Sequence, residues 1–271
     1  MSVQHHLALL PRDGLFCKDG RGWFTSASRR GHALDWPFPS TLLGALRTAC
    51  GRAIEAARRQ PLNTAEWQER TAAIVLGATL ALRRPLGTDF SVANRLWPVP
   101  ADAVFLEGRD HVTRLDPKPP LVATFGRDDD HAREGLWRPL VDDPAKPQTP
   151  HRWWRDAEFS AWLAGNAVAA NADSEQKWPS MRRRLQAHVG IVAETQTADE
   201  GILFSHDVFE TLDGEGCEWA IGCTLARAAD VPPPLDPVTL GSDRRPARVE
   251  ALSPDVFAMP AVVQTAFRTN E

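Results

Sequence analysis

Apolar and polar positions in the first hundred residues predict strands and helices. Residues 3–10 (VQHHLALL) close with four apolar side chains and end at Pro11, which is typical of a strand. From residue 40 to residue 57 apolar side chains recur every three or four positions, which predicts a helix with Ser40 as its N-cap: Leu42, Leu46, Ala49, Ala53 and Ala57. A second helix is predicted for residues 64–76, and residues 78–99 have the pattern of two strands joined by a turn.

The second half of the chain begins with a polar segment and then predicts one helix and three strands. Residues 107–150 are polar and rich in proline, and we interpret them as a long excursion. Residues 151–166 predict a short helix that ends at a glycine, and residues 187–193 predict a strand. Residues 202–211 and 217–226 are separated by a glycine-containing turn, which predicts a hairpin between them.

This irregular order of elements does not match the regular strand–helix alternation of a doubly wound sheet. We therefore expect an α+β fold of antiparallel sheets with helices on one face. We assign residues 1–150 to a first unit, which ends with the excursion, and residues 151–271 to a second unit.

Composition narrows the class of protein. Hydrophobic residues make up 43% of the 271 residues and charged residues 24%, which indicates a globular chain. The net charge of −4 argues against a globally basic nucleic-acid binder but allows a local basic face. The four cysteines form no CxxC motif, which argues against a zinc ribbon. No apolar run approaches the roughly 18 residues of a membrane-spanning helix, so we expect a cytoplasmic protein without a membrane partner.

Basic residues are concentrated in three places. Residues 11–60 contain nine basic and four acidic residues, among them Arg29, Arg30 and Arg47. A run of three arginines spans 182–184, and a pair follows Gly241 at positions 244 and 245. Three arginine groups that line one groove would bind phosphates, because guanidinium groups pair with phosphate bidentately. An ordinary solvated surface is the alternative.

The sequence contains no convincing set of catalytic residues. It contains no P-loop, no GxGxxG and no GxSxG motif, and we expect neither a cofactor nor a metal. His32 lies in a basic loop and is the candidate general acid or base. The acidic run 128–130 offers oxygen ligands, but we interpret it as a solvated acidic loop.

Four segments resemble one known family in the order that the family has them. They are residues 11–21 (PRDGLFCKDGR), 36–49 (WPFPSTLLGALRTA), 97–102 (WPVPAD) and 188–204 (HVGIVAETQTADEGILF). These segments are similar to conserved patterns of the third subunit of the type III-B CRISPR (Cmr) effector complex, a RAMP-superfamily protein. Phe204 stands where the family commonly has tyrosine.

The resemblance implies a ferredoxin-like (RRM-like) fold in two units, the second of them incomplete, rearranged or completed by a partner. It implies a non-catalytic subunit in antiviral defence that binds the 5′ repeat-derived tag of the guide RNA. Its implied protein partners are the large polymerase-like subunit and the first backbone RAMP subunit of the effector complex. An antiparallel sheet with basic loops suits single-stranded RNA.

For an RNA-binding subunit of this kind we expect the following site residues, of which the family itself implies only the loop at Gly241. Ser40, Thr41 and Arg47 would position a phosphate at the start of a helix. Arg29, Arg30 and the run Arg182, Arg183 and Arg184 would follow the RNA backbone. Gly241 would occupy the place of the glycine-rich RNA-contacting loop, with Arg244 and Arg245 near the tag.

Two alternatives stay open at this point. The first is a RAMP endoribonuclease that processes precursor guide RNA without a metal, with His32 as its acid or base. The second is a protein–protein adaptor without RNA contact, which would use a tryptophan-rich surface at Trp153, Trp154 and Trp162.

Overall fold

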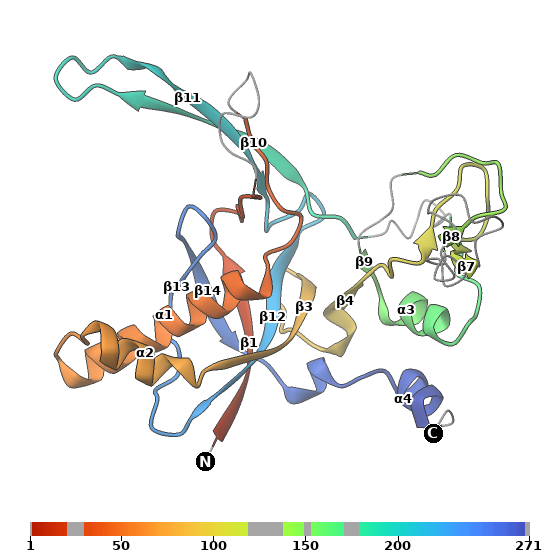
Figure 1. Cartoon of the computed structure of the whole chain (residues 1–271), viewed down its shortest axis with the longest axis horizontal. Helices are drawn as coiled ribbons and strands as arrows, with labels where there is room; N and C mark the ends of the chain where they lie inside the picture. Colours follow the sequence, from red (N-terminus) through yellow and green to blue (C-terminus); the bar gives the residue numbers. More distant parts are fainter. Residues whose placement is uncertain (1, 21–29, 119–137, 149–152, 171–178, 269–271) are drawn as a thin grey trace, which may run out of the picture. The chain divides into compact units, whose positions relative to one another are not determined.

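The computed structural model of the chain (Figure 1) describes residues 2–20, 30–118, 138–148, 153–170 and 179–268. The chain forms two compact units. Unit 1 contains residues 1–95 and 181–258, and unit 2 contains residues 96–180 and 259–271. This division differs from the expected boundary at residue 150, because the strands after residue 181 return to the sheet that the N-terminus begins.

The main sheet of unit 1 has the strand order β13-β14-β1-β12-β3. Every neighbouring pair in it is antiparallel. Its strands are β1 (Ser2–Pro11), β3 (Val75–Pro85), β12 (Cys217–Ala228), β13 (Val238–Leu240) and β14 (Arg245–Ala251). Antiparallel sheets and helices together confirm the expected α+β class.

Two helices follow β1 in sequence, α1 (Pro39–Arg58) and α2 (Thr64–Ala72). The expected N-cap at Ser40 is wrong. The cap is Phe38, and Pro39 begins the first turn. A backbone N–H at that position has no partner within the helix, so proline loses no hydrogen bond there, and its fixed φ suits a helix. Helix α2 begins with a capping box, in which Asn63 and Glu66 each bond the other's backbone N–H.

Alternate side chains of β1 enter two different cores. Leu7 and Leu9 pack with residues of α1 and β12: Leu42, Leu46, Ile221 and Leu225. Ala8 and Leu10 pack on the opposite face of the sheet: Leu82, Ala220 and Val256. The apolar run that predicts this strand is continuous because both faces of the strand are buried. Val256 belongs to the short 3-10 helix η3 (Pro254–Phe257), and another, η1 (Val92–Asn94), follows β3.

A second, smaller sheet of unit 1 is built on a long two-stranded ribbon. Strands β10 (Arg183–Ile191) and β11 (Ala198–Phe209) are antiparallel, and Figure 1 shows them as one extended hairpin. Strand β2 (Arg30–Gly31) pairs with β11 in parallel. We call the β10–β11 hairpin the ribbon.

The expected hairpin between residues 202–211 and 217–226 is wrong in its pairing. Strand β11 pairs with β10, whereas β12 lies between β1 and β3, and a single bridge at Leu212 and Glu218 joins the two segments. Residues 219–225 of β12 are all buried, as expected of a central strand that is covered on both faces. A short connection in sequence therefore did not indicate the partner strand.

Unit 2 has its own small core around tryptophan. Its helices are α3 (Asp156–Leu163) and α4 (Ala261–Arg268), and its short strands are β4 (Arg95–Pro98, which begins at the unit boundary), β5 (Ala103–Val104), β6 (Thr113–Arg114), β7 (Asp116–Lys118), β8 (Arg138–Leu140) and β9 (Trp153–Trp154). Trp154 and Trp162 pack with Phe105 and Val112. The expected excursion at 107–150 thus contributes to a folded core. In the described part of the chain, no helix has the length and hydropathy needed to cross a membrane.

Candidate nucleic-acid interface

Segments that are far apart in the sequence meet where the ribbon leaves the main sheet. The backbones of Leu15 and Phe209 exchange two hydrogen bonds of 2.8 and 2.9 Å. The N–H of Leu34 donates to the carbonyl of Cys17 at 2.7 Å, and that of Ser242 donates to the carbonyl of Phe16 at 2.8 Å. We call this region the ribbon root and define it as residues 15–19, 30–35, 182–186, 204–210 and 241–245.

Three consecutive arginines at the start of β10 present their side chains at the ribbon root. Arg182 and Arg184 share the carboxylate of Glu210, at 3.7 and 3.1 Å. Arg183 pairs with Asp35 and lies 4.8 Å from the centre of the Phe209 ring. The side chains of Arg182 and Arg184 remain 71% and 52% exposed. Because two guanidinium groups share one carboxylate, this surface keeps an excess of positive charge.

The turn from β13 to β14 supplies the second arginine pair. Gly241 has a φ of 78°, and a side chain there would come within 2.4 Å of the Phe16 carbonyl oxygen. The close backbone contact that requires glycine at position 241 is therefore a contact with the Phe16 carbonyl of the same chain. Arg244 is exposed, and among the described residues no carboxylate pairs with it.

Arg245 is held by the protein. Its side chain is only 14% exposed, and it donates to the carbonyl of Asp13 at 2.7 Å and to Oε1 of Gln186 at 2.6 Å. Oδ2 of Asp243 lies 3.3 Å from the same guanidinium. Arg245 thus joins the turn to strand β10 and positions its neighbour Arg244.

A stack of rings is formed by side chains of strands β10 and β11 together with Phe16. The ring of His206 is stacked on Phe16 at 4.0 Å and on His188 at 4.8 Å, and His188 is stacked on Phe204 at 5.0 Å. Burial lowers the pKa of His206, although Asp243 opposes that effect. This stack was not predicted from the sequence. Its signal was the spacing of Phe204 and His206, which places both on one face of a strand.

Ser40 and Thr41, which were predicted to bind phosphate, belong to α1 and not to the ribbon root. Pro39 has no N–H, and the N–H groups of Thr41 and Leu42 donate to the Phe38 carbonyl at 2.9 and 3.3 Å. Ser40 is exposed and is the remaining backbone donor of this first turn. The helix start therefore offers a phosphate fewer donors than expected.

Arg47 has a structural contact. Its guanidinium donates to the carbonyls of Ala72 and Ile74 at 2.9 and 3.1 Å and so caps the end of α2. The structure brings Arg182, Arg183, Arg184, Gly241, Arg244 and Arg245 together at the ribbon root. Arg30 joins them through the pairing of its backbone with Ser205, whereas Arg29 lies outside the described residues.

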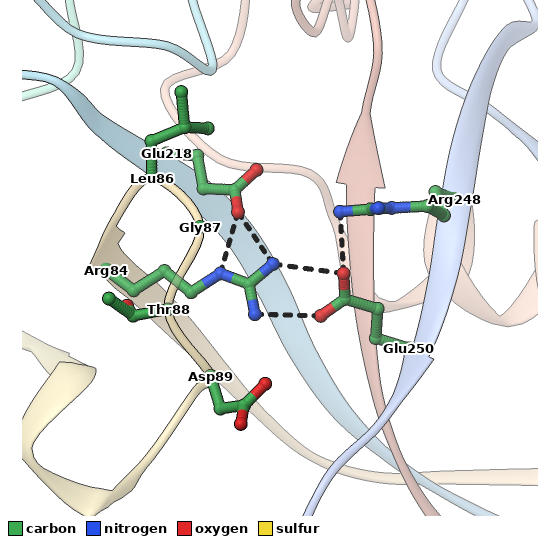
Figure 2. Close-up of a pocket in the computed structure, with 8 residues that line it drawn as sticks. All are labelled: Arg84, Leu86, Gly87, Thr88, Asp89, Glu218, Arg248 and Glu250. Carbon is green, nitrogen blue, oxygen red and sulfur yellow. Dashed lines mark hydrogen bonds and ion pairs between the residues drawn. The ribbon is translucent and has the colours of Figure 1, made fainter.

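A polar pocket on the other side of the main sheet does not suit phosphate. Figure 2 shows Arg84 between Glu218, at 2.7 Å, and Glu250, at 2.9 Å, with Arg248 on the far side of Glu250. Asp89 adds a third carboxylate to the lining. Three carboxylates face two guanidinium groups there, and Arg84 is only 5% exposed, so the pocket is an ion-pair network that ties β3, β12 and β14 together.

The two alternative functions, a nuclease and a protein–protein adaptor, depend on His32 and on three tryptophan side chains. The carbonyl of His32 accepts a hydrogen bond of 3.0 Å from the Asp19 N–H, which places the residue at the ribbon root. Trp153, Trp154 and Trp162 are 6%, 0% and 2% exposed, so they offer no adaptor surface, and Trp154 and Trp162 belong to the core of unit 2. That adaptor hypothesis is wrong in its residues.

Comparisons with known proteins give the chain a family. No curated protein matches its sequence. A chain of a type III-B Cmr-beta complex, solved by cryo-EM with cognate target RNA and AMPPnP, has a TM-score of 0.41 at 13% identity and covers 92% of this chain. A second Cmr-beta structure, bound to cognate target RNA, gives a TM-score of 0.39 at 12% identity and again covers 92% of this chain. This chain spans 63% and 64% of those two chains, which is less than two thirds of their length.

The family comparison covers nearly the whole sequence. The model of the family described as CRISPR-associated protein (Cas_Cmr3) matches residues 7–270. The match includes all four segments on which the resemblance rested and confirms that resemblance. The chain therefore belongs to the Cas_Cmr3 family of CRISPR-associated proteins.

Proposed function

We propose that this chain is a non-catalytic subunit of a type III-B CRISPR effector complex and binds the 5′ repeat-derived tag of the guide RNA at the ribbon root. The observation that carries the proposal is the meeting of two arginine clusters, separated by about sixty residues of sequence, on one surface. Guanidinium groups bind phosphate through two parallel hydrogen bonds, so a surface of this kind holds an RNA backbone without reading its bases.

A ferredoxin-like fold for unit 1 is part of the proposal. Strands β14-β1-β12-β3 lie side by side with every pair antiparallel, and helices α1 and α2 connect β1 to β3. That arrangement is the one expected of a βαββαβ unit. Its second crossover helix is replaced by residues 229–237 and strand β13, so the unit departs from the full pattern in its last third.

Within this surface the arginines have different roles. Arg182, Arg184 and Arg244 are exposed and would contact RNA phosphates, with Arg183 beside them. Gly241 and Arg245 would position the turn that carries Arg244. Arg30, on β2 next to β11, would extend the contact, and Arg29, which lies outside the described residues, stays a prediction from the sequence.

A second phosphate contact is proposed at the start of α1. Ser40 would supply its backbone N–H and its hydroxyl, and Thr41 would supply its hydroxyl. Arg47 would support this contact by fixing α1 against the end of α2 rather than by touching RNA.

Partner subunits complete the proposal. We expect the chain to dock the large polymerase-like subunit and to contact the first backbone subunit. Leu185, Val189 and Leu203 support contact with protein, because they lie on one face of the ribbon and are 56%, 49% and 62% exposed. Exposed aliphatic side chains that share one face are typical of interaction sites.

Binding of a labelled single-stranded RNA with the tag sequence tests the RNA contact. The triple variant Arg182→Ala, Arg184→Ala, Arg244→Ala should weaken binding. It should also flatten the dependence of log affinity on log salt, by a slope of about 0.7 for each phosphate that the variant no longer neutralises. Arg109→Ala is the matched control, because it removes a half-exposed arginine from unit 2. An unchanged slope in the triple variant contradicts the proposal.

Incubation of repeat RNA with the chain in EDTA tests the nuclease alternative. The proposal predicts intact RNA with the wild type and with His32→Ala. Cleavage that is lost in His32→Ala would show that the chain is an endoribonuclease.

A further inference from the structure

Two imidazoles and a carboxylate, two of them in the ribbon root and His188 next to it on β10, converge without a role in the proposed RNA contact. The ligating atoms of His188, His206 and Asp243 all lie within 4.8 Å of one another. They come from three segments, strand β10, strand β11 and the β13–β14 turn. Nε2 of His206 lies 3.2 Å from Oδ2 of Asp243.

Strand pairing explains why the two histidines meet. Gln186 is paired with His206 and His188 is paired with Phe204, so the histidines are diagonal neighbours on one face of the ribbon. Their rings are nearly parallel, with an interplanar angle of 16°. Each ring is held further by an aromatic partner, Phe16 for His206 and Phe204 for His188.

The spacing suits a tetrahedral metal ion. Bonds of about 2.1 Å to nitrogen and oxygen place neighbouring ligand atoms roughly 3.4 Å apart around zinc. The 3.2 Å separation of His206 and Asp243 is already close to that value. The widest separation has to close by about 1.4 Å, and the half-buried ring of His188 can do so by rotation, since its buried Nε2 makes no hydrogen bond within the described residues.

Charge around the three ligands permits a divalent ion. Asp243 supplies the negative charge, and the buried His206, 1% exposed, supplies a nitrogen that is shielded from solvent. The guanidinium of Arg245 lies 3.3 Å from the Asp243 carboxylate, and it keeps its hydrogen bonds to Gln186 and Asp13 when Asp243 turns to a metal. The fourth position would hold water.

We propose that His188, His206 and Asp243 bind one divalent transition-metal ion of the zinc class, which clamps the β13–β14 turn to the ribbon. The proposed ion is structural. It would link three segments that are up to 55 residues apart in sequence, and metal binding to such a site stabilises the folded chain.

Metal titration of the full chain without an affinity tag tests the site. After EDTA treatment and dialysis, the wild type should bind one equivalent of Co²⁺ with the visible absorption of a tetrahedral site. Zn²⁺ should displace the Co²⁺ and raise the unfolding temperature. His188→Ala and Asp243→Asn should each weaken binding by about 100-fold or more, because each removes one of three ligands.

His111→Ala is the matched control, because His111 is an exposed histidine of unit 2 and should bind as the wild type does. Far-UV circular dichroism of the metal-free variants checks that both retain the wild-type fold, and His188 is half-buried, so its replacement is tolerated. A wild type that binds no equivalent of Co²⁺ or Zn²⁺ overturns the proposal, as does wild-type affinity in both variants. Since no RNA is present, the result does not depend on the proposed function.

Discussion

The guanidinium of Arg245 donates a hydrogen bond of 2.6 Å to Oε1 of Gln186, and this contact joins the β13–β14 turn to strand β10. Arg244, the preceding residue, is exposed. Two consecutive arginines therefore have opposite roles, one inside the protein and one toward solvent.

Replacement of these two arginines should separate stability from RNA binding. Arg245→Ala should lower the free energy of unfolding by about 1–3 kcal/mol, because the Gln186 amide and the Asp13 carbonyl lose a charged donor. Arg244→Ala should change it by less than about 0.5 kcal/mol but weaken RNA binding. Urea unfolding and an RNA titration measure the two effects, and equal destabilisation by both substitutions contradicts the assignment.

The carboxylate of Asp213 should control the stability of the turn before β12. Its side chain is 8% exposed, accepts from Arg83 at 2.8 Å and receives the N–H groups of Glu215 and Cys217, both at 3.0 Å. Asp213→Asn should destabilise unit 1 by about 1–3 kcal/mol, since the Arg83 guanidinium then keeps only its ion pair with the exposed Glu215. Urea unfolding followed by far-UV circular dichroism measures the change. The indole N–H of Trp219 also donates to Asp213, at 3.2 Å.

The same carboxylate predicts a pH dependence. Burial alone would raise the pKa of Asp213, but the Cys217 N–H and the Arg83 guanidinium outweigh it and hold that pKa below its usual range. A lowered pKa contributes stability that is present above the unfolded value of about 3.9 and is lost as the pH falls through the folded value. The difference in unfolding free energy between wild type and Asp213→Asn should therefore be full at pH 6 and smaller at pH 3. A difference that grows toward pH 3 would show the opposite sign.

Thiol reactivity should distinguish the four cysteines. Burial raises the pKa of Cys17 and Cys50 to about 11 and that of Cys223 to about 12, so these thiols carry almost no thiolate at neutral pH. Cys217 is partly exposed. A disulfide reagent at pH 8 should label one cysteine per folded chain, and Cys217→Ser should abolish that labelling. Rapid labelling of two or more thiols in the folded state contradicts the burial.

The ion pairs around Arg84 should contribute to the stability of the fold but not to RNA binding. Arg84→Ala leaves the partly buried carboxylates of Glu218 and Glu250 without the cation between them and should cost about 3–5 kcal/mol, whereas Arg248→Ala, at the exposed edge, should cost under about 1 kcal/mol. Neither substitution should change the salt dependence of RNA binding. Weaker RNA binding by Arg248→Ala would place part of the RNA on this side of the sheet.

Local patterns predicted the elements of unit 1 but not their pairing. The stripe from Leu42 to Ala53 fixed the buried face of α1, because helical periodicity alone decides which side chains share a face. The strand at residues 217–226 was also predicted, yet it pairs with residues of β1 and β3 that are more than 130 positions away in sequence. Pairing of that kind follows from burial of both strand faces, which a short window cannot reveal.

The candidate site was predictable as a set of arginines rather than as a surface. Arg182, Arg183 and Arg184 could be predicted because they form a run of like charge. The hydrogen bond that brings the β13–β14 turn to them joins residues in different strands, and no local pattern predicts it. The N-cap of α1 was predicted at Ser40, two residues too late, since Phe38 caps the helix and Pro39 begins it. Arg47 was predicted to bind phosphate because of its charge. Its hydrogen bonds to Ala72 and Ile74 depend on the packing of α1 on α2, which the sequence does not give.

Protection of the 5′ tag in the assembled complex tests the central claim most directly. The chain would be co-expressed with the neighbouring subunits and a repeat-derived guide, purified, and treated with ribonuclease before the bound RNA is sequenced. A protected tag with the wild type, and an unprotected tag in the Arg182→Ala, Arg184→Ala, Arg244→Ala variant while the complex still assembles, is the predicted result. Equal protection of the tag in the wild type and the variant would contradict RNA binding at the ribbon root.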